Sequence, residues 1–175
     1  MAERCVLSSK EQYLFCQRAL DDLKEARSYL RCIAKQKSRI VRSGLFTATV
    51  VAYMRPFAKS QIDSQRRYWL EPTDIGFSSS EAELHNAYRK IRSKTFAHTD
   101  LDAMKASVSV LPPRPGSSSV RVRIGSICVG RDPSRSDRKD LHENITKVIR
   151  YLDETLFELH DRLAEELHAT LLPAN

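Results

Sequence analysis

Residues 141–167, LHENITKVIRYLDETLFELHDRLAEEL, decide the fold. Aliphatic residues recur in this stretch at steps of three and four, with charged residues between them. The repeat comprises Leu141, Ile145, Val148, Leu152, Leu156, Leu159, Leu163 and Leu167. Steps of three and four keep side chains on one face of an α-helix. We therefore predict one long helix over about 137–171 that buries this face in a helical bundle.

Three earlier stretches show helical spacing as well. The first begins after the candidate caps Ser8 and Ser9 and covers about 9–35, the second covers about 38–59, and the third covers about 79–98. The apolar residues of the first are Tyr13, Cys16, Leu20, Leu23, Leu30 and Ile33. The second has the broadest apolar face, formed by Val41, Leu45, Phe46, Val50, Val51, Met54 and Phe57, and should be the most buried. Pro56 is expected to kink or end it because proline has no backbone donor.

The third helix is expected to be capped by Ser79 or Ser80 and to carry an apolar stripe through Leu84, Tyr88, Ile91 and Thr95. Residues 60–80, between the second and third helices, indicate a connecting segment. Within that segment Trp69 and Tyr68 are interpreted as anchors that dock on the bundle. The alternative is that Trp69 stacks on a base of RNA.

The stretch before the last helix alternates in the manner of β-strands. KASVSV and VRVRIGSICV are separated by the turn-forming residues LPPRPGSSS, which predicts a two-stranded excursion over about 105–129. Arg121 and Arg123 would share the face opposite Val122, as a solvated strand face or as an RNA contact. The predicted fold class is all-α: a single domain over 1–175, built as an antiparallel four-helix bundle with a small two-stranded β insertion before the last helix.

Charge is unevenly distributed along the chain. There are 29 Lys and Arg residues against 22 Asp and Glu, a net charge of +7, and the excess lies before residue 136. Such asymmetry suits a polyanion such as RNA. The four cysteines show no paired spacing for zinc or redox chemistry, and no cofactor is expected. No apolar run is long enough to cross a membrane, so we expect a soluble cytoplasmic protein.

Common enzyme motifs do not occur in the chain. The sequence contains no glycine-rich phosphate loop, no GxSxG and no HExxH. P-loop nucleotide hydrolysis and α/β-hydrolase chemistry are therefore disfavoured.

Residues 84–100, LHNAYRKIRSKTFAHTD, contain the candidate site. Arg92 and His98 would differ by about 120° in direction and by ~9 Å along the axis of one straight helix. A single helix cannot bring both side chains to one phosphate. Two copies packed around a two-fold axis can place both arginines and both histidines in a shared cleft. A homodimer is therefore expected.

This stretch resembles the signature of the HEPN superfamily (higher eukaryotes and prokaryotes nucleotide-binding). In that signature an arginine is followed, after a gap of four to six residues, by a histidine near the end of a bundle helix. Together with the upstream residues YMRPF, it is similar to small bacterial proteins grouped with abortive-infection HEPN families. The resemblance implies metal-independent RNA cleavage at the dimer interface, with His98 as general acid or base and Arg92 on the scissile phosphate.

The neighbours of this pair are predicted to bind RNA: Arg89, Lys90, Ser93, Lys94 and Thr99. Besides a second copy and RNA, the resemblance suggests an antitoxin protein as partner, as for a toxin or phage-defence effector. Ser93 occupies the position after the arginine, where active HEPN nucleases often have asparagine, aspartate or histidine. A noncatalytic bundle that binds a nucleotide, RNA or a protein is therefore the alternative.

A purely structural interpretation also stays open. Arg92 would then pair with Glu81 or Asp100, and His98 would cap the last carbonyls of its helix. His85 lies on the same stripe as Arg92 and is a further candidate for the cleft. The histidines of the last helix are expected to be solvated or interfacial: His142, His160 and His168.

Overall fold

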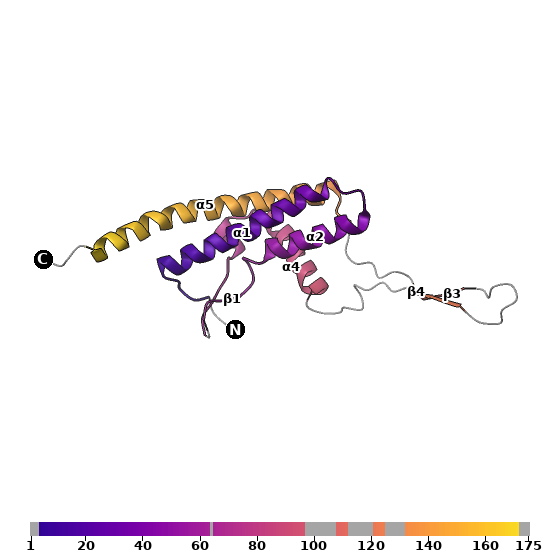
Figure 1. Cartoon of the computed structure of the whole chain (residues 1–175), viewed down its shortest axis with the longest axis horizontal. Helices are drawn as coiled ribbons and strands as arrows, with labels where there is room; N and C mark the ends of the chain where they lie inside the picture. Colours follow the sequence, from indigo (N-terminus) through magenta and orange to yellow (C-terminus); the bar gives the residue numbers. More distant parts are fainter. Residues whose placement is uncertain (1–3, 64, 97–107, 112–120, 125–131, 172–175) are drawn as a thin grey trace.

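The computed structural model of the chain describes residues 4–63, 65–96, 108–111, 121–124 and 132–171. These residues form five helices: α1 (Ser9–Ile33), α2 (Arg39–Met54), α3 (Pro72–Ile75), α4 (Ser79–Phe96) and α5 (Arg135–Leu171). They also form four short strands: β1 (Ser60–Gln61), β2 (Arg67–Tyr68), β3 (Val108–Leu111) and β4 (Arg121–Ile124). The described part of the chain is mostly helical, as the spacing predicted (Figure 1).

Three of the long helices begin with the same reciprocal pair of hydrogen bonds. A serine hydroxyl accepts from the backbone N–H three residues later, and the acidic side chain at that later position accepts from the serine N–H. The pairs are Ser8 with Glu11, Ser78 with Glu81, and Ser134 with Asp137. Each pair satisfies two amides that lack helical partners and places a negative charge at the positive end of the helix dipole. The serine that caps α4 is thus Ser78, one residue before the predicted candidates.

α2 ends at Met54 rather than at residue 59. The N–H of Arg55 still bonds to the carbonyl of Ala52 at 3.2 Å, but Pro56 cannot continue the ladder. The chain instead turns into β1, which pairs antiparallel with β2 in the register Ser60↔Tyr68 and Gln61↔Arg67. The predicted connecting segment therefore contains a short hairpin and, after it, the single turn of α3. Two-residue strands are too short to show the alternation from which strands are predicted.

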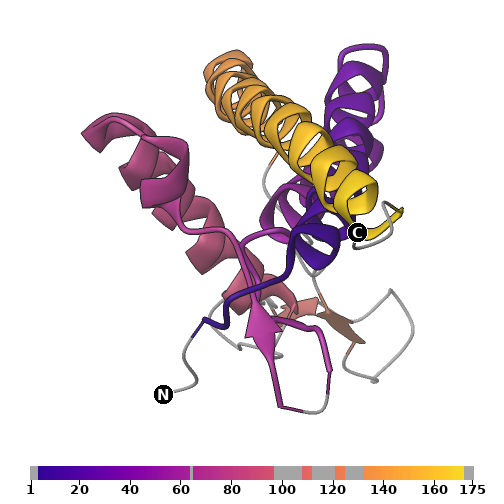
Figure 2. The same ribbon diagram turned by 90° about the vertical axis from the view of Figure 1, so that its left-hand side faces the viewer.

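α1 runs antiparallel to α2 and to α5, and α4 crosses the bundle obliquely. α1 contacts both α2 and α5, and α4 contacts the same two helices (Figures 1 and 2). Ser9 near the start of α1 donates to Glu166 late in α5 at 2.6 Å. Asn144 early in α5 donates to the carbonyl of Glu81 at the start of α4 at 3.2 Å. These contacts fix which ends of the helices meet.

The core lies between these helices. The predicted stripe of α5 is buried at Leu141, Ile145, Val148, Leu152, Leu156 and Leu159, and half-buried at Leu163. α1 adds Cys16, Leu20, Leu23, Leu30 and Ile33, as its spacing predicted. On α2 the buried face includes Phe46, Val50, Tyr53 and Met54, whereas Val41, expected on the apolar face, is 44% exposed.

The hairpin is anchored by its aromatic residues, as one of the two interpretations of the sequence held. Tyr68 is buried and meets the ring of Phe15 edge-on, with centroids 4.7 Å apart. Trp69 is half-buried, its indole N–H donates to the carboxylate of Glu71, and the Nζ of Lys59 lies 5.1 Å from the ring centroid. These contacts hold the Trp69 ring within the connecting segment, as expected of a loop anchor.

β3 and β4 form a second antiparallel pair, from Val108↔Ile124 to Leu111↔Arg121. Both strands lie inside the predicted excursion over 105–129. The predicted facing of Arg121 and Arg123 concerns side chains outside the described part of the chain.

Candidate functional site

Packing of α4 determines which way Arg92 faces. His85 and Tyr88 are buried, at 1% and 3% exposure, and Arg92 follows at the next helical step and is half-buried. Ile91, predicted to belong to the apolar stripe, is 38% exposed. The buried stripe thus passes through His85 instead, because Tyr88 fits against Phe46, with centroids 6.2 Å apart, and His85 has a polar partner inside the core.

His85 is a core residue and does not belong to the cleft suggested by the sequence. Its Nδ1 lies 3.0 Å from the hydroxyl of Tyr53, and either group can donate, depending on the tautomer of the ring. Phe57 and Phe77 pack around the ring, with centroids 4.4 Å and 5.7 Å away. Burial, with the nearby charge of Arg89 as a second cause, lowers the pKa of His85 from 6.5 to about 4. A neutral, enclosed imidazole supports packing and cannot reach RNA.

Acidification should therefore destabilise the fold through His85. The unfolded chain binds this proton near pH 6.5 and the folded chain only near pH 4, so the contribution is fully present above about 6.5 and is lost as the pH falls through this window. The expected loss is on the order of 2–3 kcal/mol. Urea unfolding between pH 7 and 4.5 would measure it. His85→Gln should flatten the profile in this range; an unchanged slope would contradict the assignment.

Arg92 has no acidic partner in the described part of the chain. Neither an ion pair nor a hydrogen bond joins its side chain to any residue that the structure describes. Glu81, suggested by the structural interpretation, pairs with Lys147 at 2.7 Å instead, and Asp100 lies outside the described residues. Within the described part of this chain, Glu81 is thus not the partner of Arg92, and the suggested pairing with Asp100 stays a prediction.

The neighbours of Arg92 on α4 are polar and solvated. Arg89 and Lys90 are exposed, and neither has an ion-pair partner among the described residues. Ser93 is exposed too, and its hydroxyl donates to the carbonyl of Arg89 at 3.0 Å. His98 and Thr99 lie outside the described residues, as does the side chain of Lys94. The structure therefore places Arg89, Lys90, Arg92 and Ser93 together on the last turns of α4.

The middle of α4 packs against two other helices. The hydroxyl of Tyr88 donates to the carbonyl of Asp137 in the first turn of α5 at 3.2 Å, and the ring of Tyr88 lies 6.2 Å from that of Phe46 on α2, measured between centroids. The starts of α2 and α5 lie together at the right-hand end of the helices in Figure 1, and the end of α4 lies below α2.

This end of the bundle is strongly basic. Arg42 clamps Asp132 with two hydrogen bonds, at 3.0 Å and 2.6 Å, and lowers the pKa of that carboxyl; the charges of Arg39 and Arg138 act in the same direction. One carboxylate thus sits among several guanidinium groups. We use the name basic end for the three arginines around Asp132, Arg39, Arg42 and Arg138, taken together with Arg89 and Arg92 on the last turns of α4.

Sequence reasoning missed part of this surface. Arg39, Arg42 and Arg138 were counted in the overall positive charge but not assigned to a site. Their only signal in the sequence is a position in the first turns of two helices, where arginine is not favoured by the helix dipole. His142, His160 and His168 are exposed on α5, as expected for solvated positions.

Within the described ranges, no group of three or more His, Cys, Asp or Glu side chains is arranged to hold a metal ion. Among the same residues no helix is both long enough and apolar enough to cross a membrane. Comparison of the chain with protein-family models, with curated protein sequences and with solved structures finds no match.

Proposed function

We propose that the chain is a HEPN-like endoribonuclease that cleaves RNA, without a metal ion, at a homodimer interface formed by the basic end. Arg92 holds the scissile phosphate and His98 transfers protons. Arg89, Lys90, Lys94, Ser93 and Thr99 bind the adjoining RNA backbone. The biological setting we propose is a toxin or phage-defence effector, restrained by an antitoxin protein.

The single observation that carries this proposal is the environment of Arg92. The residue is half-buried on α4, and no carboxylate in the described part of the chain pairs with its guanidinium. Partial burial of a charge costs free energy that an arginine usually recovers from an acidic partner. Arg89 and Lys90 lie on the same turns of α4 and are also without an acidic partner among the described residues, and we propose that an anion pairs with Arg92. A phosphate group fits because it accepts two parallel hydrogen bonds from one guanidinium.

The proposed chemistry is an internal transfer of the phosphoryl group. The 2′-oxygen of a ribose attacks the adjacent phosphorus, the bond from phosphorus to the 5′-oxygen breaks, and the products carry a 2′,3′-cyclic phosphate and a 5′-hydroxyl. One histidine takes the proton of the 2′-hydroxyl and another delivers a proton to the leaving 5′-oxygen. Imidazole suits both roles because it titrates near neutral pH. The guanidinium of Arg92 stabilises the charge that develops on the phosphoryl oxygens.

Apolar side chains at the basic end support the proposed homodimer. Ile40 is 84% exposed at the start of α2, and Ile91 and Val41 are also exposed. Exposed aliphatic side chains beside a charged surface are typical of protein contacts. A second copy that covers them would bring two Arg92 side chains towards one another, as a shared phosphate site requires.

A noncatalytic HEPN-like binding bundle is the second candidate. Ser93 favours it, because the residue after the arginine has its hydroxyl turned back onto the helix carbonyl of Arg89. A binder of RNA or nucleotide would use the same basic end but leave the RNA intact. Measuring the affinity for RNA therefore tests the basic end, which both candidates use. Measuring RNA cleavage distinguishes the nuclease from the noncatalytic binder.

Loss of two arginines from the basic end should weaken RNA binding. In a His98→Ala background, Arg39→Gln combined with Arg138→Gln is expected to bind a single-stranded 20-mer roughly 10- to 30-fold more weakly at 0.1 M salt. The slope of log affinity against log salt should become shallower by about 1.4, since each lost phosphate contact removes about 0.7 for single strands. Fluorescence anisotropy across a salt series would measure both values.

The matched control removes two charges elsewhere. Lys24 and Arg150 are exposed on α1 and α5, away from the basic end, and make no ion pair with a described residue. Lys24→Gln combined with Arg150→Gln should change affinity by less than about threefold, through net charge alone. Equal losses for the two double variants would mean that RNA senses only the net charge, and would contradict the proposed interface.

A further inference from the structure

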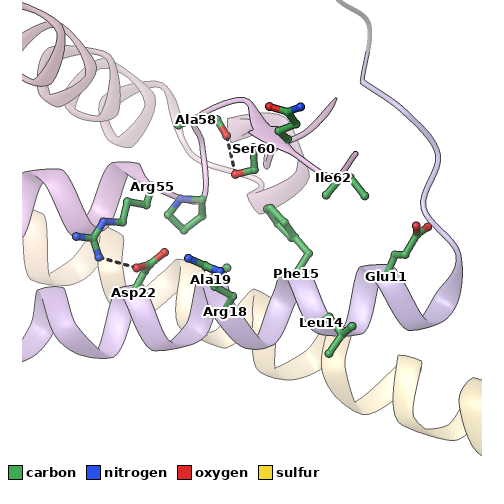
Figure 3. A pocket seen from close by; sticks show the side chains of 12 residues that line it. Glu11, Leu14, Phe15, Arg18, Ala19, Asp22, Arg55, Ala58, Ser60 and Ile62 are labelled. Atoms are coloured by element: carbon green, nitrogen blue, oxygen red, sulfur yellow. Dashed lines mark hydrogen bonds and ion pairs between the residues drawn. The ribbon is translucent and has the colours of Figure 1, made fainter. Parts of the chain in front are cut away.

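A pocket of about 630 Å³ lies away from the basic end, between the first half of α1 and residues 55–62, which lead from α2 into β1 (Figure 3). Its volume falls within the range of small-molecule sites. Apolar side chains form its walls: Leu14, Phe15, Ala19, Pro56, Ala58 and Ile62.

Small side chains and a fixed ring keep this space open. Ala19 on α1 and Ala58 on the opposite wall leave room that larger residues would fill. Phe15 points from α1 towards the opposite wall in Figure 3, and its ring is held edge-on by Tyr68. Leu14 is 59% exposed at the rim. A planar apolar group entering the pocket would therefore cover aromatic and aliphatic surface that now faces solvent.

Three of the charged residues that line the pocket, Glu11, Asp22 and Arg55, are held in ion pairs. At one end Arg55 binds Asp22 and Glu25, each at 2.8 Å. At the other end Arg66 binds Glu11 at 2.7 Å and Asp63 at 2.5 Å. The arginine and carboxylate groups at the two ends are thus committed to one another.

Arg18 is the exception among the charged residues of the lining. It is exposed between the two ion-paired ends, and it makes neither an ion pair nor a hydrogen bond with a described residue. All five of its N–H groups are therefore unused within the described chain. The Nη2 group of Arg55 makes no hydrogen bond with a described residue either. Among the charged side chains that line the pocket, Arg18 is therefore the one without a charged partner in the described part of the chain.

We propose that this pocket binds a small aromatic carboxylate. The ring of the ligand lies between Phe15 and the wall formed by Pro56 and Ala58, and its carboxylate accepts two hydrogen bonds from Arg18. An apolar wall with a single placed charge is the usual composition of a small-molecule site, and the guanidinium fork matches a planar carboxylate. This site is separate from the RNA surface and does not depend on the proposed function.

Two ligands that share one ring system test the proposal. Isothermal titration of the full chain would compare 2-naphthoate with 2-naphthalenemethanol, which keeps the ring but replaces the carboxylate by a neutral alcohol. We expect 2-naphthoate to bind at least about tenfold more tightly. Arg18→Gln should abolish that difference, because the exposed side chain contributes a charge-assisted contact rather than packing. Lys24 is an exposed cation on another face of α1, and Lys24→Gln should leave the affinities for both ligands unchanged.

A variant in which a larger side chain fills the pocket provides the second part of the test. Ala58→Phe should abolish binding of both ligands, and its thermal unfolding curve would show that the variant is folded. Leu14→Ala shortens a side chain at the edge of the pocket and keeps the pocket open. It should lower the affinity for both ligands by a similar factor. The proposal is overturned if the wild-type chain binds neither ligand, if it binds both equally, or if the preference for the carboxylate survives Arg18→Gln.

Discussion

Arg92→Gln should cleave RNA about 10²- to 10³-fold more slowly than the wild-type chain while remaining folded. The substitution removes the positive charge and the two-pronged donor that the proposed mechanism places on the scissile phosphate. Loss of one such donor usually lowers the rate by this factor. Arg92 is half-buried and has no carboxylate partner in the described chain, so its replacement leaves no described acid unpaired. Initial rates on a fluorophore-labelled RNA would measure the loss.

Two further variants separate catalysis from general attraction. Arg150→Gln removes an exposed charge from the middle of α5 and should retain nearly full activity. Arg92→Lys keeps the positive charge but loses the planar guanidinium with its two parallel donors. Its rate of RNA cleavage should fall between those of the wild-type chain and Arg92→Gln. If Arg92→Gln cleaved within a few fold of the wild-type rate, the arginine would have no part in the chemistry.

Leu152→Ala should lower the free energy of unfolding by about 2–5 kcal/mol. Leu152 is fully buried at the centre of the α5 stripe that decided the predicted fold. Truncation there removes apolar contacts and leaves a cavity that long packed helices cannot easily close. Urea unfolding followed by circular dichroism would measure the change.

Phe157→Ala is the matched control on the same helix. Phe157 is 72% exposed, so removing its larger side chain should cost less than about 1 kcal/mol. An equal loss for the two variants would show that α5 packs on a different face from the one described here.

The sequence predicted the helices well wherever an apolar repeat was long. The α5 stripe is buried from Leu141 to Leu159, and the buried face of α1 runs through the predicted residues. Prediction failed where a contact from another element decides the structure. Pro56 indicated that α2 would end, but the hairpin that follows depends on pairing between β1 and β2 and on the anchoring of Tyr68.

In the candidate site, too, spacing within one helix was informative, whereas contacts between helices could not be predicted. Spacing on one helix drew attention to Arg92, and the structure leaves it half-buried without an acidic partner in the described chain. Spacing alone could not show that Tyr53 on α2 offers His85 a partner, so that this histidine turns into the core. Nor could it show that Arg39 and Arg138, far apart in the sequence, lie with Arg42 around Asp132. Those neighbours arise because α2 and α5 both run antiparallel to α1 and therefore start at the same end of the bundle.

Metal-free RNA cleavage is the central claim, and the purified chain can test it directly in excess EDTA. A mixed-sequence RNA would be incubated with the wild-type chain and with His98→Ala, both checked by sedimentation for the same folded dimer, and the cleaved ends would be mapped. We predict that the wild-type chain cuts and leaves 2′,3′-cyclic phosphate and 5′-hydroxyl ends, whereas His98→Ala does not. Intact RNA after incubation with a folded wild-type dimer, or equal cutting by His98→Ala, would contradict the account.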